Sequence, residues 1–255
     1  MRLVTWNIDG LTDAHLDERT EAAIFTSILG ARLDELHGGT KPTPPPDVIV
    51  FQEVVKRTFQ AHMLQHLPAG GYTVLPVAVP ERQTFELIAF RDPYRLLAYE
   101  SFPLEQSKYG RIMHVVDLDS PEGQVRVVTA HMDSGTEAGN IRTAQLFQVA
   151  EALGAADTAD AIAPAIFGGD TNLRKAEWEA MRKEIGITDV WERLGELAST
   201  RYTWRRDDYK ARFDRVFVGP GFTPVALGPL GTEPLPGLDG PISDHIGLVA
   251  TVRRK

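Results

Sequence analysis

The sequence predicts an α+β fold built mainly from antiparallel strands. Short runs of apolar and β-branched residues, typical of strands, outnumber segments with helical spacing by about two to one. Two of these runs are joined directly by a turn at Pro121–Gly123. So short a connection pairs strands antiparallel, whereas parallel strands need a long crossover. We therefore expect sheets with flanking helices rather than regular alternation of strand and helix.

Each predicted strand is an apolar run bounded by polar or turn-forming residues. In chain order the predicted strands are Arg2–Trp6, Asp47–Phe51, Tyr72–Val79, Thr84–Phe90, Ile112–Leu118, Gln124–Ala130, Ala165–Phe167, Phe213–Val218 and Ile246–Val252. So many strands in 255 residues imply that sheets make up most of the core.

Helical spacing of apolar residues occurs in a few longer segments between the strands. The predicted helices are Glu18–Leu36, Thr58–Leu67, Asn140–Leu153 and Ala176–Ile185, and the apolar positions of the first are Phe25, Ile28, Leu29, Leu33 and Leu36. The Gly- and Pro-rich segment His37–Pro46 has the composition of a linker. We predict a surface loop there, because the strands on its two sides supply the same group of polar residues. Residues 1–255 are therefore expected to form one domain.

The composition is that of an ordinary globular protein, with 43% hydrophobic and 24% charged residues. Because the chain has no cysteine, disulfides, thiolate zinc sites and cysteine nucleophiles are excluded. No apolar run approaches the roughly 18 residues of a membrane span, so we expect a cytoplasmic protein without a membrane partner. The formal net charge of −8 argues against a purely electrostatic nucleic-acid binder but permits a local basic patch.

Polar side chains follow several predicted strands at the point where each strand ends. These side chains belong to Asn7, Gln52-Glu53, His131 and Gly168–Asn172. The last predicted strand has the reverse order, because Ser243-Asp244-His245 leads into it. If that strand runs antiparallel, its start lies at the same edge of the sheet as the other strand ends. We therefore expect these segments to bring their polar side chains together at one edge.

This group of side chains favours one class of chemistry. It combines the carboxylates Asp9, Glu53, Asp170 and Asp244, the amides Asn7 and Asn172, and the imidazoles His131 and His245. Carboxylates without thiolates suit Mg²⁺ or Mn²⁺, which keep positions open for water and a phosphoryl oxygen. A nearby carboxylate or histidine can activate the water, while amides donate hydrogen bonds to phosphoryl oxygens. The sequence therefore predicts metal-assisted hydrolysis of a phosphoester.

Other motifs are more ambiguous. Ser243-Asp244-His245 contains the residue types of a hydrolase triad, but consecutive side chains cannot stack in that order and no Gly-x-Ser-x-Gly segment occurs. The run Arg201–Arg215 mixes aromatic and cationic residues and is either a solvated loop or a nucleic-acid groove. The best candidates for base stacking and phosphate contacts in such a groove are Arg111, Arg174, Trp204, Arg205 and Arg206. The remaining histidines, which include His62 and His66, are expected to be surface or packed residues.

Several segments together resemble the signature segments of the endonuclease/exonuclease/phosphatase superfamily. They are Thr5–Leu11, Phe51–Val54, Thr129–His131, Gly169–Arg174, Arg212–Arg215 and Ser243–His245, and they span nearly the whole chain. The resemblance implies a four-layer α/β sandwich of two packed, mainly antiparallel sheets flanked by helices. It also implies a monomeric, Mg²⁺-dependent phosphodiesterase of DNA repair, with Mn²⁺ as a substitute. The expected substrate is a DNA 5′ end, single-stranded and carrying a tyrosyl or protein adduct.

The resemblance also implies which residues hold the metal. Glu53 is expected to be the principal Mg²⁺ ligand. Asn7, Asp9 and Asp244 are expected around the ion or its bound waters.

For the reaction itself, the resemblance assigns Asp170 to orient or deprotonate the attacking water and Asn172 to hold that water or the phosphate. His245, aligned by Asp214, is expected to stabilise or protonate the phosphate. His131 is expected to donate a hydrogen bond to a phosphoryl oxygen. The residues expected to line the substrate path are Ser134 and Arg174.

Two positions depart from the family pattern. Thr136 stands where the family segment that starts at His131 has an arginine, so a phosphate contact is expected to be lost. Lys175 stands where an aspartate is usual, which reverses a charge beside the site. These changes concern the leaving group rather than hydrolysis. One alternative is therefore a small-molecule or lipid head-group phosphoester, which the acidic net charge favours. A non-catalytic binding protein is the other, and the combination of a water-activating acid with a metal ligand argues against it.

Overall fold

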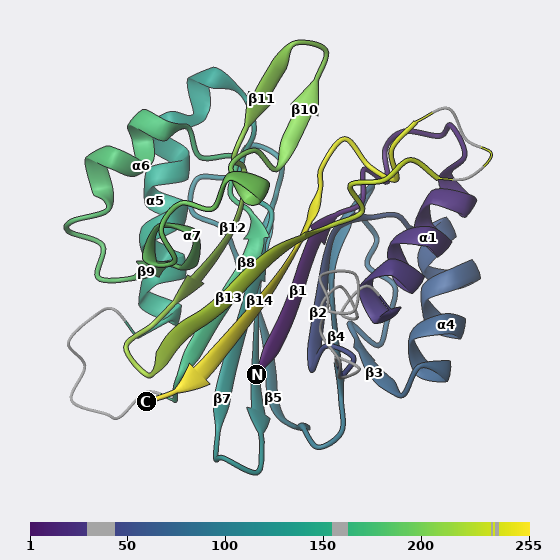
Figure 1. The fold of residues 1–255 in the computed structure, drawn as a ribbon, viewed down its shortest axis with the longest axis horizontal. Helices are drawn as coiled ribbons and strands as arrows, with labels where there is room; N and C mark the ends of the chain where they lie inside the picture. The colour runs from purple at the N-terminus through teal and green to yellow at the C-terminus, as the bar shows by residue number, and fades with distance from the viewer. Residues whose placement is uncertain (30–43, 155–162, 236, 238–239) are drawn as a thin grey trace.

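Two six-stranded sheets face each other at the centre of the molecule (Figure 1). The computed structural model describes residues 1–29, 44–154, 163–235, 237 and 240–255. The first sheet has the order β13 (Phe222–Leu230), β14 (Gly247–Arg254), β1 (Arg2–Asn7), β2 (Val48–Val54), β4 (Phe85–Arg91) and β3 (Tyr72–Leu75). The second has the order β5 (Arg95–Pro103), β6 (Ile112–Asp119), β7 (Val125–Ala130), β8 (Ala165–Asp170), β12 (Asp214–Val218) and β9 (Thr188–Asp189).

Within these sheets, β1 and β2 run parallel, as do β7 and β8, and the other pairs of described strands are antiparallel. The predicted mainly antiparallel pairing is thus confirmed. The predicted turn at Pro121–Gly123 joins β6 to β7, and the Gly123 N–H donates to the carbonyl oxygen of Ser120 at 2.9 Å. Gly123 has a φ of +98°, a conformation that glycine adopts without steric cost.

Helices cover the outer faces of both sheets (Figure 1). The first sheet is covered by α1 (Leu16–Leu29) and by a continuous segment made of α3 (Lys56–Thr58), a π-helical turn (Phe59–Met63) and α4 (Leu64–Ala69). The second sheet is covered by α5 (Gly139–Ala152) and α6 (Lys175–Met181), with the short α7 (Val190–Arg193) beside them. The predicted α+β class and four-layer sandwich are confirmed. None of the described helices is both long and apolar enough to cross a membrane.

Three apolar cores separate the four layers. Alternation along β1 places Leu3 between the two sheets and Val4 under the helices of the first sheet. β2 divides in the same way, with Val50 between the sheets and Ile49 under the helices. The third core packs α5 against the second sheet. Because both faces of the central strands are buried, their sequences are continuous apolar runs rather than alternating ones.

Of the strands at the edges of the two six-stranded sheets, β3 lies within the predicted strand Tyr72–Val79, whereas β5, β13 and the two-residue β9 were not predicted. β5 is largely exposed, so its sequence lacks the apolar pattern of a buried strand. β13 contains Pro224 and Pro229, which cannot donate to a sheet but are tolerated because this strand pairs on one side only. The segment predicted as a solvated loop or groove contains a separate hairpin of β10 (Trp204–Arg206) and β11 (Tyr209–Ala211). This hairpin projects beyond the sheets at the top of Figure 1.

The first helix differs most from its prediction. α1 begins at Leu16 and buries the face formed by Leu16, Arg19, Thr20, Ala23, Ile24 and Ser27. Phe25 and Leu29, which were expected to face inward, are 43% and 50% exposed. The buried face consists partly of small and polar residues, so apolar spacing selected the wrong side of the helix. Residues 30–36 of this prediction, and all of the predicted loop before residue 44, lie outside the described residues.

Candidate active site

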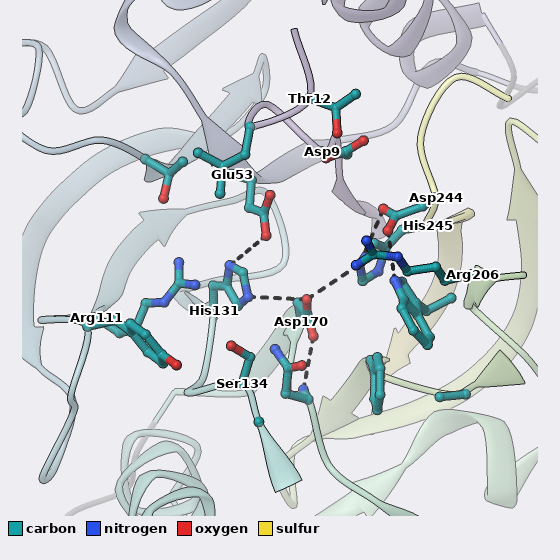
Figure 2. A pocket seen from close by; sticks show the side chains of 18 of the residues that line it. Asp9, Thr12, Glu53, Arg111, His131, Ser134, Asp170, Arg206, Asp244 and His245 are labelled. Carbon is teal, nitrogen blue, oxygen red and sulfur yellow. Dashed lines mark hydrogen bonds and ion pairs between the residues drawn. The ribbon is translucent and has the colours of Figure 1, made fainter. Parts of the chain in front are cut away.

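The polar residues predicted at the strand ends lie together at one end of the two sheets (Figure 2). β14 runs antiparallel to β1, as expected, and the indole Nε1 of Trp6 donates to the carbonyl oxygen of His245 at 3.0 Å. In the second sheet, Asp214 at the start of β12 pairs with Asp170 at the end of β8. His131 follows β7 and forms an isolated bridge with Asp170. The sheet topology therefore positions all of these side chains.

Buried Gln52 joins the two sheets beneath this end. Its Nε2 donates to Thr129 Oγ1 at 3.1 Å, and Thr129 Oγ1 donates to the carbonyl oxygen of Gly168 at 2.7 Å. Gly168 permits the close approach, because a Cβ atom there would lie 2.7 Å from Leu3 Cδ2. The polar side chains thus stand on a rigid base.

An open cavity of about 1330 Å³ lies over these residues. The predicted site residues that line it are Asp9, Glu53, Arg111, His131, Ser134, Asp170, Asn172, Arg174, Trp204, Arg206, Asp244 and His245. Asn7 and Asp214 have no exposed surface and lie beneath the cavity floor. Arg205 does not line the cavity, because alternation along β10 turns it away from the face that carries Trp204 and Arg206. The prediction that Arg205 contacts substrate is therefore not supported by its position.

Three site segments share one local backbone motif, in which a side chain accepts the N–H two residues further on. Asn7 Oδ1 accepts from the Asp9 N–H at 3.0 Å, and Asp170 Oδ1 accepts from the Asn172 N–H at 2.9 Å. Ser243 Oγ accepts from the His245 N–H at 3.1 Å. Such turns are typical of Asn, Asp and Ser. Ser243 thus acts here as a turn former, since its Oγ also donates to the carbonyl oxygen of Asn7 at 2.8 Å.

Asn7 connects the two central carboxylates from below. Its Nδ2 donates to Glu53 Oε1 at 3.2 Å and to Asp170 Oδ2 at 3.0 Å. Glu53 occupies a left-handed conformation with a φ of +56°, within an irregular stretch of β2 between Phe51 and Val54. This irregularity aims the Glu53 carboxylate into the cavity (Figure 2).

The electrostatics of Glu53 and Asp9 fit a divalent cation. Burial raises the pKa of Glu53 to about 7. The negative charge of Asp170 also raises this pKa, whereas the hydrogen bond from Asn7 lowers it. Burial and the charge of Asp244 raise the pKa of Asp9. Both carboxylates line the cavity, although Asp9 also pairs with Arg19 at 3.4 Å, and their oxygen atoms are the donors that Mg²⁺ and Mn²⁺ prefer. Glu53, Asp9 and Asp244 form no compact three-ligand cluster among the described residues, but Mg²⁺ needs only one or two carboxylates beside its waters.

His245 is held as an imidazolium. Burial alone would lower its pKa, but the charge of Asp214 and a hydrogen bond of 2.7 Å between Asp214 Oδ2 and His245 Nδ1 raise the pKa to about 10. The Nε2 atom then points toward the cavity, 3.8 Å from both Asp170 Oδ2 and Asp244 Oδ1. Near neutral pH this ring therefore presents a positive N–H to the cavity.

His131 differs from His245 in its protonation state. Complete burial lowers the pKa of His131 to about 3, so the ring is neutral. Its Nε2 lies 3.3 Å from Asp170 Oδ2 and its Nδ1 lies 3.7 Å from Glu53 Oε1. A neutral ring in this position adds a hydrogen-bond donor without adding positive charge.

An aromatic and cationic wall lies on one side of the cavity. The Trp204 and Phe213 rings lie 5.2 Å apart, and the Trp204 Nε1 donates to Asp244 Oδ2 at 2.8 Å. The Arg174 guanidinium lies 4.9 Å from the centre of the Phe213 ring. On the opposite side, the Arg111 guanidinium lies 5.7 Å from the centre of the Tyr109 ring. Phe213 and Tyr109 were not predicted as site residues, since a lone aromatic carries no signal that separates a cavity wall from a core.

The two departures from the family pattern directly follow residues that line the cavity. Thr136 lies in a one-turn 3-10 helix (Thr136–Ala138) and contacts Glu137. The Lys175 side chain is 88% exposed and pairs with Glu179 at 3.6 Å. Neither residue lines the cavity, although the residues before them, Gly135 and Arg174, do.

The two-sheet fold with a cavity lined by carboxylates and histidines is typical of phosphoester hydrolases, and comparison with known protein families identifies which one. The sequence profile of the Endonuclease/Exonuclease/phosphatase family matches residues 4–245, and the chain belongs to this family. Tyrosyl-DNA phosphodiesterase 2 of Gallus gallus is 29% identical to the chain over 262 residues, which cover 97% of this chain. The chain spans 65% of the length of that relative.

Two solved structures are similar over nearly the whole of both chains. The crystal structure of a humanized D. rerio TDP2 with 14 mutations has a TM-score of 0.81 and 27% identity, and covers 99% of this chain and 98% of its own. D. rerio TDP2 complexed with a single-strand DNA product has a TM-score of 0.80 and 26% identity, with the same coverage. The predicted family is thus confirmed, and the similar structures share the two-sheet architecture.

Proposed function

We propose that the protein is a Mg²⁺-dependent phosphodiesterase that hydrolyses 5′-tyrosyl linkages at single-stranded DNA ends, acting as a monomer. The observation that carries the proposal is the arrangement of two histidines in different protonation states around one carboxylate. His245 is positive, His131 is neutral, and the Asp170 carboxylate lies between them. The names of the similar proteins, and the DNA product bound to one of them, support the substrate class.

Two residues of the chain are placed to orient and deprotonate the attacking water. Asp170 and Asn172, held by their shared turn, are placed to bind it. The water oxygen attacks phosphorus, its proton passes to Asp170, and the bond between phosphorus and the leaving-group oxygen breaks. His245 donates its Nε2–H to a non-bridging oxygen and balances the negative charge that develops there. A tyrosine phenolate, with a parent pKa of about 10, leaves without needing a strong acid.

The cation would be held by Glu53, with Asp9 and Asp244 contacting it or its waters. Bound there, it would supply Lewis-acid stabilisation of the phosphoryl oxygens. The poorly compensated charge of Glu53 is the feature of this chain that supports such binding.

The size and walls of the cavity favour an extended substrate. Its volume of about 1330 Å³ exceeds the roughly 300 to 1,000 Å³ that is usual for small-molecule sites. Trp204 offers an aromatic surface for a base, and Arg206 stands on the same side of β10 for a backbone phosphate.

The experiment compares a 5′-phosphotyrosyl oligonucleotide with a p-nitrophenyl phosphodiester, each with Mg²⁺. We expect the oligonucleotide to be hydrolysed with the higher kcat/KM, to a 5′-phosphate and tyrosine. Arg206→Ala should weaken the oligonucleotide reaction alone, and Arg205→Ala is the matched control because its side chain lies outside the cavity. Equal kcat/KM on both substrates would instead favour a small-molecule or lipid head-group phosphoester.

A further inference from the structure

A second group of ionisable side chains lies on the outer side of the first sheet, away from the cavity. Glu21 on α1 and His62 and His66 on the π-helical turn and α4 place their ligand-type atoms within 4.8 Å of one another. None of the three lines the cavity over the sheet ends. The two imidazole rings are stacked, with centroids 6.2 Å apart and an interplanar angle of 9°.

The distances in this group match the size of a small metal ion. His62 Nδ1 lies 3.1 Å from Glu21 Oε1, and His66 Nε2 lies 3.4 Å from the same oxygen. Zinc binds imidazole nitrogen and carboxylate oxygen at about 2.0 to 2.1 Å in a tetrahedral arrangement. Two ligand atoms of such a tetrahedron lie about 3.3 Å apart, so Glu21 Oε1 is spaced from each imidazole nitrogen as a shared ion would require, and all three ligand atoms lie within 4.8 Å of one another.

A fourth residue, Asp17, fixes the orientation of His62. Its Oδ1 lies 3.0 Å from His62 Nε2, and its other carboxylate oxygen pairs with Arg57. A neutral imidazole has one N–H and cannot donate to both Asp17 and Glu21. If Nε2 donates to Asp17, the Nδ1 lone pair faces the Glu21 carboxylate, and a cation between them relieves the repulsion. Carboxylates that hold the far nitrogen of a histidine are typical neighbours of metal-binding histidines.

We propose that His62 Nδ1, His66 Nε2 and Glu21 Oε1 bind one transition-metal ion of the zinc class, with water completing the coordination. Two imidazoles select such ions over Mg²⁺, whose preferred donors are oxygen atoms. The side chains of His62 and His66 are 15% and 27% exposed, so the ion can enter from solvent.

This ion links α1 to α4 and thereby supports the cavity from behind. Arg19 on α1 donates through Nη2 to the carbonyl oxygen of Asp9 at 3.1 Å, and through Nη1 to that of Ile242 at 3.0 Å. α1 therefore holds the loop that carries Asp9. Fixing α1 to its neighbour restrains that loop without placing the ion in the cavity.

The test measures Zn²⁺ binding to the untagged full chain by equilibrium dialysis, in excess Mg²⁺ to fill oxygen-only sites. We expect one equivalent to bind to the unaltered protein. His66→Ala or Glu21→Gln removes a ligand and should weaken binding by about 100-fold or more. Asp17→Asn alters only a supporting contact and should cost about tenfold. Gln65→Ala, at an exposed neighbouring position of α4, is the matched control and should bind normally.

Two further measurements keep the result interpretable. Circular dichroism in chelator shows that each variant is folded, and Zn²⁺ should then raise the melting temperature of the unaltered protein but not of His66→Ala. Glu53→Gln should leave Zn²⁺ binding intact, since Glu53 belongs to the cavity. Binding that survives His66→Ala, or that disappears in Glu53→Gln, would overturn the proposal, as would no binding at all.

Discussion

Replacing Asp214 by Asn tests whether the imidazolium of His245 is needed for turnover. Asn keeps the size of the side chain and can still accept the Nδ1–H hydrogen bond, so the ring should keep its orientation. What the substitution removes is the negative charge 2.7 Å from the ring. The variant therefore separates the charge of His245 from its position.

The size of the effect follows from the pKa of His245. Burial opposes protonation, and Asp214 is the largest influence that overcomes it and raises the pKa to about 10. Without that charge, only the weaker influences of Asp170 and Asp244 favour the protonated ring, while burial still disfavours it. The pKa of His245 should therefore return toward the unperturbed value of about 6.5. At pH 8 a group with that pKa is about 3% protonated, so turnover should fall about thirtyfold.

The assay is the ratio of kcat for Asp214→Asn to kcat for the unaltered enzyme, measured from pH 6 to pH 9 with saturating Mg²⁺. The ratio should approach one near pH 6, where the ring of the variant regains its proton, and should fall steadily above pH 7. Removing the ring altogether in His245→Ala should cost about 100-fold or more at every pH. A ratio that does not change with pH, or a larger loss in Asp214→Asn than in His245→Ala, would refute the reasoning.

Further expectations concern stability, metal and substrate. His245→Ala leaves the fully buried Asp214 without a counter-charge and should lower the free energy of unfolding by about 3 kcal/mol, so an unchanged melting temperature would contradict the assigned pairing. The raised pKa of Glu53 weakens the folded state as pH rises from about 4.5 to about 7, so Glu53→Gln in chelator at pH 7.5 should stabilise the protein by up to about 3 kcal/mol. The same variant should bind Mg²⁺ more weakly and turn over more slowly, and rising Mg²⁺ should partly restore turnover; if rising Mg²⁺ changed neither, Glu53 would not be a ligand. Continued activity of the unaltered enzyme in excess chelator would exclude the metal mechanism. Trp204→Ala should weaken oligonucleotide hydrolysis about tenfold while sparing a chromogenic phosphodiester, whereas equal losses with a lower melting temperature would make Trp204 a core residue.

The central strands and the site end of the sheets were predictable because their signal is local. β1, β2, β7 and β8 are buried on both faces, so each is an apolar run whose last residue is followed by a polar one. Once β14 is antiparallel to β1, the position of His245 follows from the sheet alone.

Features that depend on the third dimension were not predictable in the same way. Arg205 and Arg206 are adjacent residues of the same type. Which of them reaches the cavity depends on which face of the β10–β11 hairpin lies toward the cavity. The buried face of α1 was misassigned because Arg19 is buried through hydrogen bonds to distant backbone carbonyl groups, which no apolar pattern reveals. The group of Glu21, His62 and His66 likewise forms from two helices that are far apart in sequence.

The spacing of two residues in the site motifs has a structural cause that sequence comparison alone does not reveal. Asp9 and Asn172 both have a φ of +49°, a conformation that costs an ordinary side chain about 1 kcal/mol or more. In each case the side chain two residues earlier, Asn7 or Asp170, accepts the N–H of the strained residue and holds the turn. The same two side chains also hydrogen-bond to each other at 3.0 Å. Substituting either one therefore loosens two turns as well as removing a functional group, so its loss of activity measures positioning and chemistry together. Asp170→Asn can keep the oxygen that accepts the Asn172 N–H, but its amide nitrogen replaces the oxygen that accepts from Asn7, so it preserves one turn while removing both the carboxylate and the contact with Asn7.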